Sequence, residues 1–498
     1  MYYPTLEQAK SLTAQGAFRR VPVCREILSD FTSPIQVLRT LQSVGHHCFL
    51  LESAEDTQRW GRFTFLGFHP TLEVTCMNGL LRVRGGRKPY NRDTERTENV
   101  AHPGAVLREL LAEYRSPKVP GLPPFTGGLV GYFSYDYVKY AEPSLSLDAR
   151  DTEGFQDMDL MLFDEVIAFD NYRQKLILIV NADTERLEES YAEACRELDA
   201  VADLIRRGPP QERVHGKLLS PLRPLFDKEQ YCRMVERGKE YIREGDIFQV
   251  VLSNRLEADF EGSLLDAYRV LRASNPSPFM FYFSSDDIEI AGASPETLVK
   301  LQDGALRTFP LAGTRPRGAT PQEDAALEKD LLSDEKELAE HNMLVDLGRN
   351  DIGKISDFGS VVVEKYLSVE RFSHVMHIGS TVKGRIRADR DAVDAVDAIL
   401  PAGTLSGAPK LRAMEIINEL ENNKRGLYGG AVGYLDFTGN LDVCIAIRLA
   451  FKKNGKVFIR SGAGIVADSV PEKEYQECEN KAKAVVQALE TAQGGDDL

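Results

Sequence analysis

The sequence predicts an α+β fold, because strand-like stretches come as antiparallel hairpins and helical stretches are grouped between them, without strict strand-helix alternation. Three hairpin signals support this prediction most clearly. Each consists of apolar, strand-like residues around a short glycine-containing turn: 71–86 around Asn78-Gly79, 297–310 around Asp303-Gly304, and 434–451 around Thr438-Gly439-Asn440. Asn-Gly is the strongest of these turn signals, since both residues tolerate the positive φ angles of a tight hairpin.

The first half of the chain shows both kinds of element. The predicted elements are a helix at 33–44, a buried strand at 48–51, a hairpin at 160–180 and a long helix at 184–207. The first helix has the clearest beginning, because Ser33 can cap it and Pro34 suits its first turn.

A cluster of prolines and glycine between residues 208 and 224 interrupts every periodic pattern. We therefore predict two domains, 1–215 and 216–498. After this boundary the pattern predicts a helix beginning at Asp227 and a buried strand at 247–252.

The composition describes a large globular protein: 498 residues, 43% hydrophobic and 28% charged. A formal net charge of −15 without any basic run argues against nucleic acid as a partner. No stretch is apolar enough for a membrane span, and the N-terminus lacks a signal-peptide pattern, so we expect a cytoplasmic protein. The seven cysteines show no Cys-x-x-Cys spacing, which argues against structural zinc and against a disulfide framework.

The most informative stretch is 459–482, in which a glycine-broken loop is predicted to lead into a helix. Ser469 and Glu472 have the spacing of a capping box. Glu474, Glu477 and Lys481 then share one helical face, which usually means a solvated surface. The loop contains Gly462-Ala463-Gly464, whose backbone N–H groups an anion could approach closely.

A second helix, around 337–347, carries Glu340 inside an apolar stripe, with Glu337 on the same face. A buried carboxylate needs a cation or a hydrogen-bond donor. With Glu474 and Glu477 these residues could form an oxygen-rich site for Mg²⁺. An ordinary ion pair with arginine or lysine is the alternative at this point.

These stretches resemble the chorismate-utilising enzymes, and among them the component I subunits of anthranilate synthase, over almost the whole chain. Besides 459–482, the matching segments are G-D-I-F-Q-V-V-L-S (245–253), P-L-A-G-T-R-P-R-G (310–318), E-L-A-E-H (337–341) with D-L-G-R-N-D (346–351), V-M-H-I (375–378), G-T-L-S-G-A-P-K (403–410), G-G-A-V-G-Y (429–434) and I-A-I-R (445–448). Their number and order make the resemblance specific.

The resemblance implies two antiparallel sheets packed roughly orthogonally as a sandwich, with helices outside. It also implies that ammonia replaces the ring hydroxyl of chorismate and that pyruvate is then eliminated, leaving anthranilate. Carried over by residue, Glu340 and Glu477 are implied as Mg²⁺ ligands and catalytic groups, with Glu337 and Glu474 in support, and His377 is implied as the general acid/base. The implied substrate-binding residues are Gly313, Thr314, Thr404, Tyr434, Arg448, Gly462, Ala463, Gly464 and Lys481.

Two positions separate the relatives. Aminodeoxychorismate synthases carry a nucleophilic lysine where this chain has Ala312, and water-using relatives carry a lysine base where it has Gln249. Ala312 makes that covalent route unavailable, and Gln249 favours external ammonia as the nucleophile. Gly379 departs from the β-branched residue common in the family and puts the local strand in doubt.

The same resemblance implies a regulatory site to which the first half of the chain contributes. Residues 50–53 and 275–280 resemble the two segments that form a pocket for L-tryptophan, the feedback inhibitor. The residues expected there are Leu51, Glu52, Ser53, Pro278, Phe279 and Met280. Glu52 could pair with the amino group, while Phe279 and Met280 offer apolar contact. A strand end and a proline-rich turn are the plain alternative.

No cysteine lies in the Gly-x-Cys-x-Gly setting of a glutamine amidotransferase. We therefore expect a separate glutaminase subunit to supply ammonia, in a hetero-oligomer. Two other functions stay open: aminodeoxychorismate synthase, which Ala312 disfavours, and a tryptophan-binding regulatory subunit without catalysis, which the retained glutamates and His377 disfavour.

Overall fold

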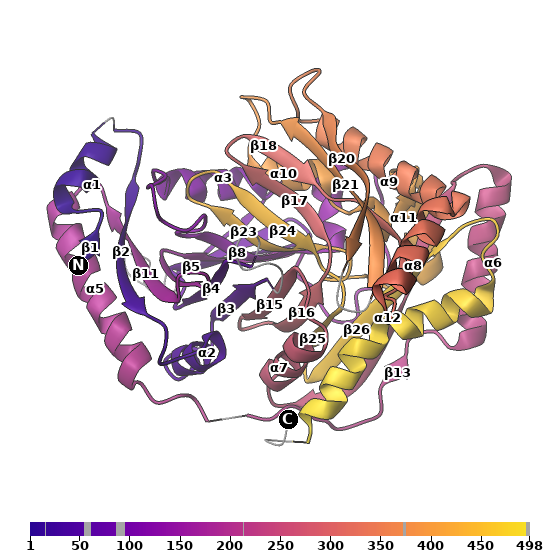
Figure 1. Ribbon diagram of the computed structural model, residues 1–498, viewed down its shortest axis with the longest axis horizontal. Helices are drawn as coiled ribbons and strands as arrows, with labels where there is room; N and C mark the ends of the chain where they lie inside the picture. Colours follow the sequence, from indigo (N-terminus) through magenta and orange to yellow (C-terminus); the bar gives the residue numbers. More distant parts are fainter. Residues whose placement is uncertain (15, 54–60, 86–94, 213, 372–374, 495–498) are drawn as a thin grey trace.

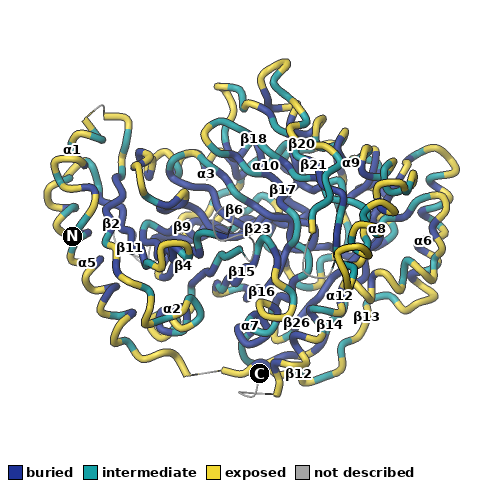
Figure 2. Tube along the Cα trace, viewed as in Figure 1, coloured by how far each residue is buried: buried dark blue, intermediate teal, exposed yellow. Residues whose placement is uncertain are grey.

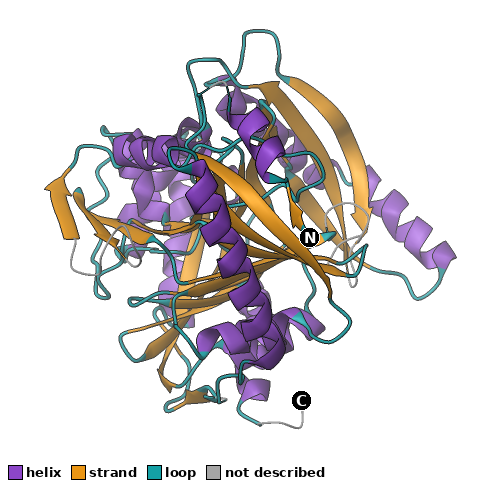
Figure 3. Cartoon of the chain, turned by 90° about the vertical axis from the view of Figure 1, so that its left-hand side faces the viewer, coloured by secondary structure: helices purple, strands orange, loops and turns teal. Residues whose placement is uncertain are grey.

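A computed structural model describes residues 1–14, 16–53, 61–85, 95–212, 214–371 and 375–494. In these residues the strands form two sheets in which every paired strand runs antiparallel to its neighbour (Figure 1). Helices lie outside the sheets, as Figure 1 and the rotated view in Figure 3 show. The α+β prediction and its two antiparallel sheets are confirmed.

Within the described residues, the larger sheet has 14 strands. Its order is β1 (Tyr2–Tyr3), β2 (Arg20–Leu28), β11 (Lys175–Asp183), β10 (Glu165–Asp170), β4 (Phe63–Phe68), β3 (Cys48–Glu52), β15 (Phe279–Ser284), β16 (Glu289–Ser294), β25 (Leu449–Lys453), β26 (Lys456–Ile465), β14 (Gln249–Glu261) and β12 (Lys217–Leu218), with β13 (Arg223–Pro224) and β22 (Gly407–Ala408) also paired to β14.

The second sheet has 12 strands in the described part of the chain. Its order is β19 (Leu311–Pro316), β21 (Val375–Arg385), β18 (Ala305–Thr308), β17 (Thr297–Gln302), β24 (Leu441–Ile445), β23 (Ala431–Asp436), β8 (Gly128–Phe133), β9 (Met158–Phe163), β5 (Leu72–Met77), β6 (Leu80–Gly85) and β7 (Glu95–Asn99), with β20 (Val362–Arg371) paired to β21.

The α-helices connect and cover these strands. They are α1 (Leu6–Thr13), α2 (Pro34–Gln42), α3 (Gly104–Glu113), α4 (Val138–Ala141), α5 (Leu187–Arg207), α6 (Lys228–Glu244), α7 (Leu265–Ser274), α8 (Pro321–Ser333), α9 (Glu335–Gly353), α10 (Ala392–Ile399), α11 (Lys410–Glu421) and α12 (Pro471–Ala492), and two 3₁₀ turns are η1 (Tyr135–Tyr137) and η2 (Gly403–Leu405). No helix of the described residues is long and apolar enough to cross a lipid bilayer.

The molecule has four layers, with helices, the two sheets and further helices in succession. A large apolar cluster fills each of the three spaces between them. On β3, Leu50 faces α2, α5, α7 and α12, whereas the neighbouring Phe49 faces the other sheet, where its ring centroid lies 4.8 Å from that of Phe163. This alternation follows from the two-residue period of a strand. A third cluster joins the second sheet to α3, α9 and α10. Figure 2 shows the result, with buried strands inside and exposed helix faces outside.

Both sheets run across the predicted domain boundary near residue 215. In the larger sheet β3 pairs with β15, and in the smaller one β8 pairs with β23. The segment around residue 215 is a connection between α5 and α6. The two halves therefore share their sheets, so the predicted boundary does not separate two independent cores.

Two of the predicted hairpins combine strands of different sheets. Residues 158–163 form β9 of the smaller sheet, while the hairpin itself is β10 with β11 of the larger one. Likewise, 434–451 contains the hairpin β23–β24 and then crosses to β25. A crossing between two buried sheets leaves the apolar pattern unbroken, so periodicity alone did not reveal it.

Candidate active site

At two places the chain passes from one sheet to the other, and each of these crossing segments carries an ionisable residue, one a glutamate and the other an arginine. Glu296 lies between β16 and β17, and Arg448 lies between β24 and β25. The backbone N–H of Ala293 donates to Arg448 O at 3.1 Å, and that of Ile445 donates to Glu296 O at 2.9 Å. Arg448 has a φ of 51°, in the left-handed region that residues other than glycine rarely adopt. These two backbone hydrogen bonds therefore hold the two crossing segments against each other.

Glu296 was not among the predicted site residues, yet it lies among three of them, Thr404, Arg448 and Lys481. Burial raises the pKa of its carboxyl to about 7, although a hydrogen bond from Thr404 Oγ1 at 3.1 Å and the charges of Arg448 and Lys481 lower it. Burial lowers the pKa of Arg448. Within the described residues the Arg448 guanidinium has no recorded hydrogen bond or ion pair, so it can bind an anion.

His377 lies on β21, opposite Thr314 of β19. Its Nδ1 lies 2.8 Å from Gly313 O and 3.1 Å from Thr314 Oγ1. A carbonyl oxygen only accepts, so Nδ1 carries the proton and Nε2 is the basic nitrogen. Burial lowers the pKa of His377 against the Gly313 hydrogen bond, and the positive charge of Arg448 lowers it further. The imidazole is therefore neutral near pH 7.

The predicted glycine-broken loop is wrong: Gly462, Ala463 and Gly464 belong to β26 and pair in register with β14. Their small size has a steric reason. A Cβ on Gly462 would lie 2.7 Å from the hydroxyl oxygen of Tyr428, and one on Gly464 would lie 2.4 Å from Nε2 of Gln249. Pairing of β26 with β25 ends at Ile459, so the glycine-containing stretch extends beyond it.

The structure places the predicted Tyr434 elsewhere. Its ring packs on Phe65 and Phe125, with centroids 6.4 and 4.4 Å away, and it lines a cavity between the sheets. The tyrosine that lies against Gly462 is Tyr428, six residues earlier in the same segment. Sequence alone could not choose between them, because both lie next to glycines in one segment, 426–434.

The beginning of α12 also differs from the prediction. Its N-cap is Val470, without a side-chain cap, and the Ser469 hydroxyl instead accepts from the backbone N–H of Val466 at 3.1 Å. Ser469 also hydrogen-bonds the carboxyl of Glu474. The capping box of Ser469 with Glu472 therefore does not form, since this serine holds the turn before the helix.

Lys481, in the middle of α12, connects the helix to the glycine-containing strand β26. Its Nζ donates to Gly462 O at 3.0 Å and lies 2.6 Å from Glu477 Oε1. Lys481 also acts electrostatically on Glu296. The predicted residues Thr404, Arg448 and Lys481 thus all act on Glu296, and Lys481 also contacts the predicted Gly462.

The four predicted metal-binding glutamates come from two helices, with Glu337 and Glu340 on α9 and Glu474 and Glu477 on α12. Burial raises the pKa of Glu340, and the charges of Glu337 and Glu477 raise it further, against the nearby Lys336 and Lys481. One carboxylate raises the pKa of another only when the two lie close together, so Glu337, Glu340 and Glu477 lie in one region.

The donor set fits a hard divalent cation. In the described part of the chain Glu340 has no recorded hydrogen bond or ion pair, although it is half-buried among like charges. Glu337 lies 3.5 Å from Arg315, and that arginine also forms ion pairs with Asp330 and Asp334. No three of the four carboxylates approach within 4.8 Å of one another. The arrangement suits an ion that keeps several water ligands, as Mg²⁺ does.

Gln249 is buried beside Gly464, and its Oε1 has no hydrogen-bond partner among the described residues. An amide oxygen can accept a hydrogen bond but cannot act as a general base near neutral pH. Ala312 lies on β19, opposite Ile378. Position 379 is in strand β21, so Gly379 does not interrupt it.

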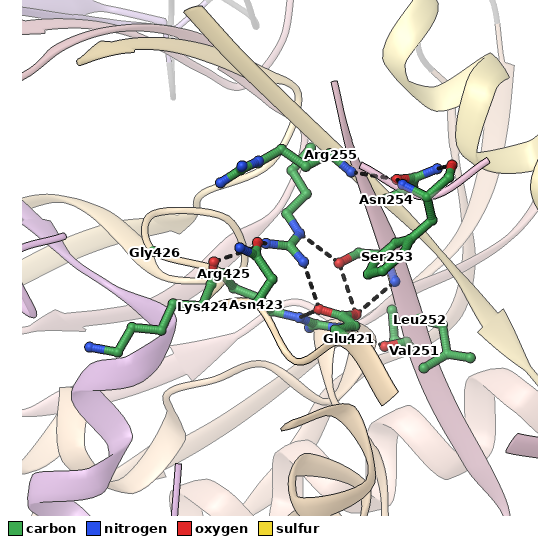
Figure 4. A network of polar contacts seen from close by, with 12 residues as sticks. Val251, Leu252, Ser253, Asn254, Arg255, Glu421, Asn423, Lys424, Arg425 and Gly426 are labelled. Atoms are coloured by element: carbon green, nitrogen blue, oxygen red, sulfur yellow. Dashed lines mark hydrogen bonds and ion pairs between the residues drawn. The ribbon is translucent and has the colours of Figure 1, made fainter. Parts of the chain in front are cut away.

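A buried ion network supports the strands beneath this site (Figure 4). Glu421 accepts from Arg425 at 2.6 Å and from Arg460 at 2.9 Å, and each of the three side chains is 1% exposed. Its carboxylate also accepts from the N–H and hydroxyl of Ser253 at 2.8 and 2.9 Å, while Arg425 donates to Val251 O at 2.7 Å. The network therefore connects α11 with β14 and β26.

The six predicted regulatory residues line one cavity of about 450 Å³: Leu51, Glu52, Ser53, Pro278, Phe279 and Met280. Pairing of β3 with β15 brings the two segments together, with Met280 opposite Glu52. Glu52 Oε1 accepts from Tyr268 Oη at 2.5 Å and from Arg272 Nε at 2.6 Å. The cavity has the size and apolar lining of a small-molecule site.

Comparisons with known proteins identify the family of this chain. The chorismate binding enzyme family model matches residues 46–487. Anthranilate synthase component 1 of Acetivibrio thermocellus is 44% identical, with 99% of each chain covered, and that of Pseudomonas aeruginosa is 45% identical, covering 98% of this chain and 99% of its own.

Solved structures show the same likeness. The crystal structure of anthranilate synthase component I from Streptococcus pneumoniae is 40% identical, covers 92% of this chain and 98% of its own, and has a TM-score of 0.75. The menaquinone-specific isochorismate synthase of Escherichia coli, 20% identical with a TM-score of 0.68 over 97% and 99% of the two chains, shares the fold. The chain therefore belongs to the chorismate-binding enzymes, in the family of the anthranilate synthase component 1 proteins.

Proposed function

We propose that the protein is the chorismate-aminating subunit of an anthranilate synthase, which catalyses the first step of tryptophan biosynthesis. Ammonia adds to the ring of chorismate as the ring hydroxyl leaves, giving aminodeoxyisochorismate. Elimination of pyruvate then gives anthranilate. The observation that carries the proposal is the convergence of Glu296, Arg448, Lys481 and His377 at the crossings between the sheets, beside a glutamine instead of a lysine at position 249.

Glu340 and Glu477 would hold Mg²⁺, with Glu337 and Glu474 supporting it through water. Bound there, the ion would supply Lewis-acid stabilisation of charge on the substrate as the hydroxyl leaves. These carboxylates need a cation to relieve their repulsion, and the raised pKa of Glu340 expresses that need.

Arg448, Tyr428 and Thr404 bind and orient the substrate in this proposal. Arg448 offers a planar fork for a carboxylate, and Tyr428 adds a hydroxyl beside Gly462. Lys481 is held by Gly462 O and adds positive charge near the same carboxylates. These groups hold the ring in one orientation relative to Glu296 and His377.

In the amination step, the nitrogen lone pair forms the new C–N bond, both ring double bonds shift, and the C–O bond to the hydroxyl breaks. The ammonium group that forms then loses its extra proton to solvent, which leaves the amino group. Glu296 donates the proton with which that hydroxyl leaves as water, because a pKa of about 7 keeps part of its population protonated. Gln249 Oε1 accepts a hydrogen bond from the attacking ammonia, which needs no base to become nucleophilic.

In the elimination step, His377 Nε2 takes the proton from the ring carbon that carries the new amino group. The C–O electron pair leaves with pyruvate, and the ring becomes aromatic. A neutral imidazole suits this role, and its lowered pKa keeps it neutral.

The test is to incubate the purified chain with chorismate, Mg²⁺ and ammonium at mildly alkaline pH and to identify the product by chromatography and mass. Anthranilate is expected. The para isomer would instead identify an aminodeoxychorismate synthase, and salicylate would identify a water-using relative. Absence of turnover, with the chain folded and also with a glutaminase subunit added, would contradict the proposed activity.

We also propose that a separate glutamine amidotransferase subunit supplies ammonia in a cytoplasmic hetero-oligomer. All seven cysteines are free thiols in the structure, and none lies in an amidotransferase nucleophile setting. Glutamine should therefore support turnover only when that subunit is present, whereas ammonium should support it without the subunit.

The cavity lined by residues 51–53 and 278–280, between the two sheets, is proposed as the site of feedback inhibition by L-tryptophan. Both recorded contacts of Glu52 are made by Oε1, so Oε2 is the oxygen for the amino group. Met280→Ala and Ser53→Ala should weaken inhibition while turnover with ammonium persists. Met234→Ala, in a buried part of α6 outside this cavity, is the matched control. Unchanged inhibition in both cavity variants would contradict this assignment.

A further inference from the structure

The connection between α2 and β3 meets the turn between β15 and β16 at one end of the larger sheet. Because Cys48 pairs with Ser284, the residues just outside this pair are neighbours. His46 Nε2 lies 2.6 Å from Asp286 Oδ1, and His47 Nε2 lies 3.3 Å from the same oxygen. The two imidazole rings lie side by side, with centroids 4.1 Å apart. Two imidazole nitrogens and one carboxylate oxygen therefore lie close together.

We propose that His46, His47 and Asp286 form a binding site for a divalent transition metal ion of the Zn²⁺ type. Zn²⁺ takes imidazole nitrogens and carboxylate oxygens at about 2.0–2.1 Å in a tetrahedron, so neighbouring ligand atoms lie about 3.3 Å apart. The three ligand atoms already lie within 4.8 Å of one another, and two of the separations are 2.6 and 3.3 Å. Small side-chain rotations would complete the geometry.

A charged group behind Asp286 orients its carboxylate. Arg84 on β6 lies 2.5 Å from Asp286 Oδ2 and 2.6 Å from Glu73 Oε2. Arg84 therefore holds the far oxygen and leaves Oδ1 turned to the histidines. Its positive charge is shared by two carboxylates, so this cluster keeps a net negative charge that favours a cation. Supporting contacts of this kind fix the orientation of metal ligands.

A pocket of about 300 Å³ gives the ion access and room for a further ligand. His46, His47 and Asp286 line it together with His69, whose Nε2 lies 2.8 Å from Val44 O. Because His69 is held by that carbonyl, water is the expected fourth ligand. His46 and Asp286 are 63% and 43% exposed, so the ion can enter from solvent.

This site differs in chemistry from the acidic cluster of α9 and α12. Imidazole nitrogens favour zinc-like ions, whereas carboxylate oxygens with water favour Mg²⁺. The absence of Cys-x-x-Cys spacing argues against thiolate sites of that spacing, but it gives no information on a site built from histidines. A bound ion would hold the ends of β3 and β15 together, opposite the ends that carry Ser53 and Pro278.

The test uses the full chain, freed of metal by a chelator and kept in excess Mg²⁺ so that the acidic cluster is occupied. Titration with Co²⁺ should give visible absorption bands of nitrogen-coordinated cobalt at one equivalent, and Zn²⁺ should displace them. His47→Ala and Asp286→Asn should each weaken binding by about tenfold to a hundredfold or more, since each removes a direct ligand.

His102→Ala is the matched control, because His102 Nε2 lies 3.2 Å from Asp397 Oδ2 and, among the residues that the structure describes, no further ligand completes a group of three there. It should bind Co²⁺ like the unaltered chain. Circular dichroism establishes that each variant is folded. The inference is overturned if no cobalt band forms in excess Mg²⁺, if both ligand variants bind unchanged, or if Glu340→Gln abolishes the band.

Discussion

Glu421 and Glu340 are both withdrawn from water in the second half of the chain, yet their surroundings are opposite. Burial alone would raise the pKa of Glu421, but Arg425 and Arg460 beside it hold that pKa below its usual value. Burial and neighbouring glutamates raise the pKa of Glu340. The first carboxylate has its charge compensated by the protein, and the second lacks such compensation. The difference distinguishes a structural ion network from a site that needs a ligand.

The strongest test of this comparison is Glu421→Gln. It would leave two buried guanidinium groups facing each other, and removing one partner of a buried ion network costs about 3–5 kcal/mol. We expect the free energy of unfolding to fall by that amount, measured by urea denaturation. The matched control is Glu415→Gln on the same helix, whose half-exposed pair with Arg412 should contribute less than about 1 kcal/mol. Equal stability of the two variants would remove the distinction.

The second test is Glu340→Gln. Removing an uncompensated charge should leave stability unchanged or slightly raised, while Mg²⁺-dependent turnover falls by about a hundredfold or more, since Lewis-acid stabilisation contributes several kcal/mol. Steady-state rates over a Mg²⁺ titration measure this effect. Glu335→Gln, on the exposed face of the same helix, is the control. Undiminished turnover in the Glu340 variant would exclude it as a ligand.

The third test concerns Glu296, whose pKa is raised from 4.5 to about 7. Between these values the folded chain holds a proton that the unfolded chain has lost, so its contribution to the free energy of unfolding decreases as pH rises from about 4.5 to about 7. Glu296→Gln should lack this decrease and so be the relatively more stable form above pH 7. Urea midpoints at pH 5, 6, 7 and 8 measure the difference, and parallel profiles would contradict the assigned pKa.

The smallest effect is expected for Glu337→Gln. Arg315 lies 3.5 Å from Glu337 and compensates part of its charge, so Glu337 is intermediate between the two cases. Its loss should raise the Mg²⁺ concentration for half-maximal rate by about tenfold or less, as for a supporting group. An effect as large as that of Glu340→Gln would make Glu337 a direct ligand.

The sequence by itself determined the local elements. Ser33 caps α2, Asp227 begins α6 with a capping box, and Asn78-Gly79 turns the β5–β6 hairpin with φ angles of 50° and 80°. These features depend on residues within a few positions of one another, so pattern and propensity suffice. The ordered segments of 245–482 likewise indicated the family before any contact was known.

Only the tertiary structure decided which residues meet at the crossings between the sheets. Glu296 became visible as a site residue through its contact with Thr404 and its burial near Arg448. Gly462 and Gly464 are typical of a loop by composition, yet they lie in a strand because the segment pairs with β14. Tyr428 and Gln249 leave no room for side chains there, which explains the glycines. The physical reason is common to these cases: long-range packing sets burial, neighbours and charge, and local periodicity carries no information about them.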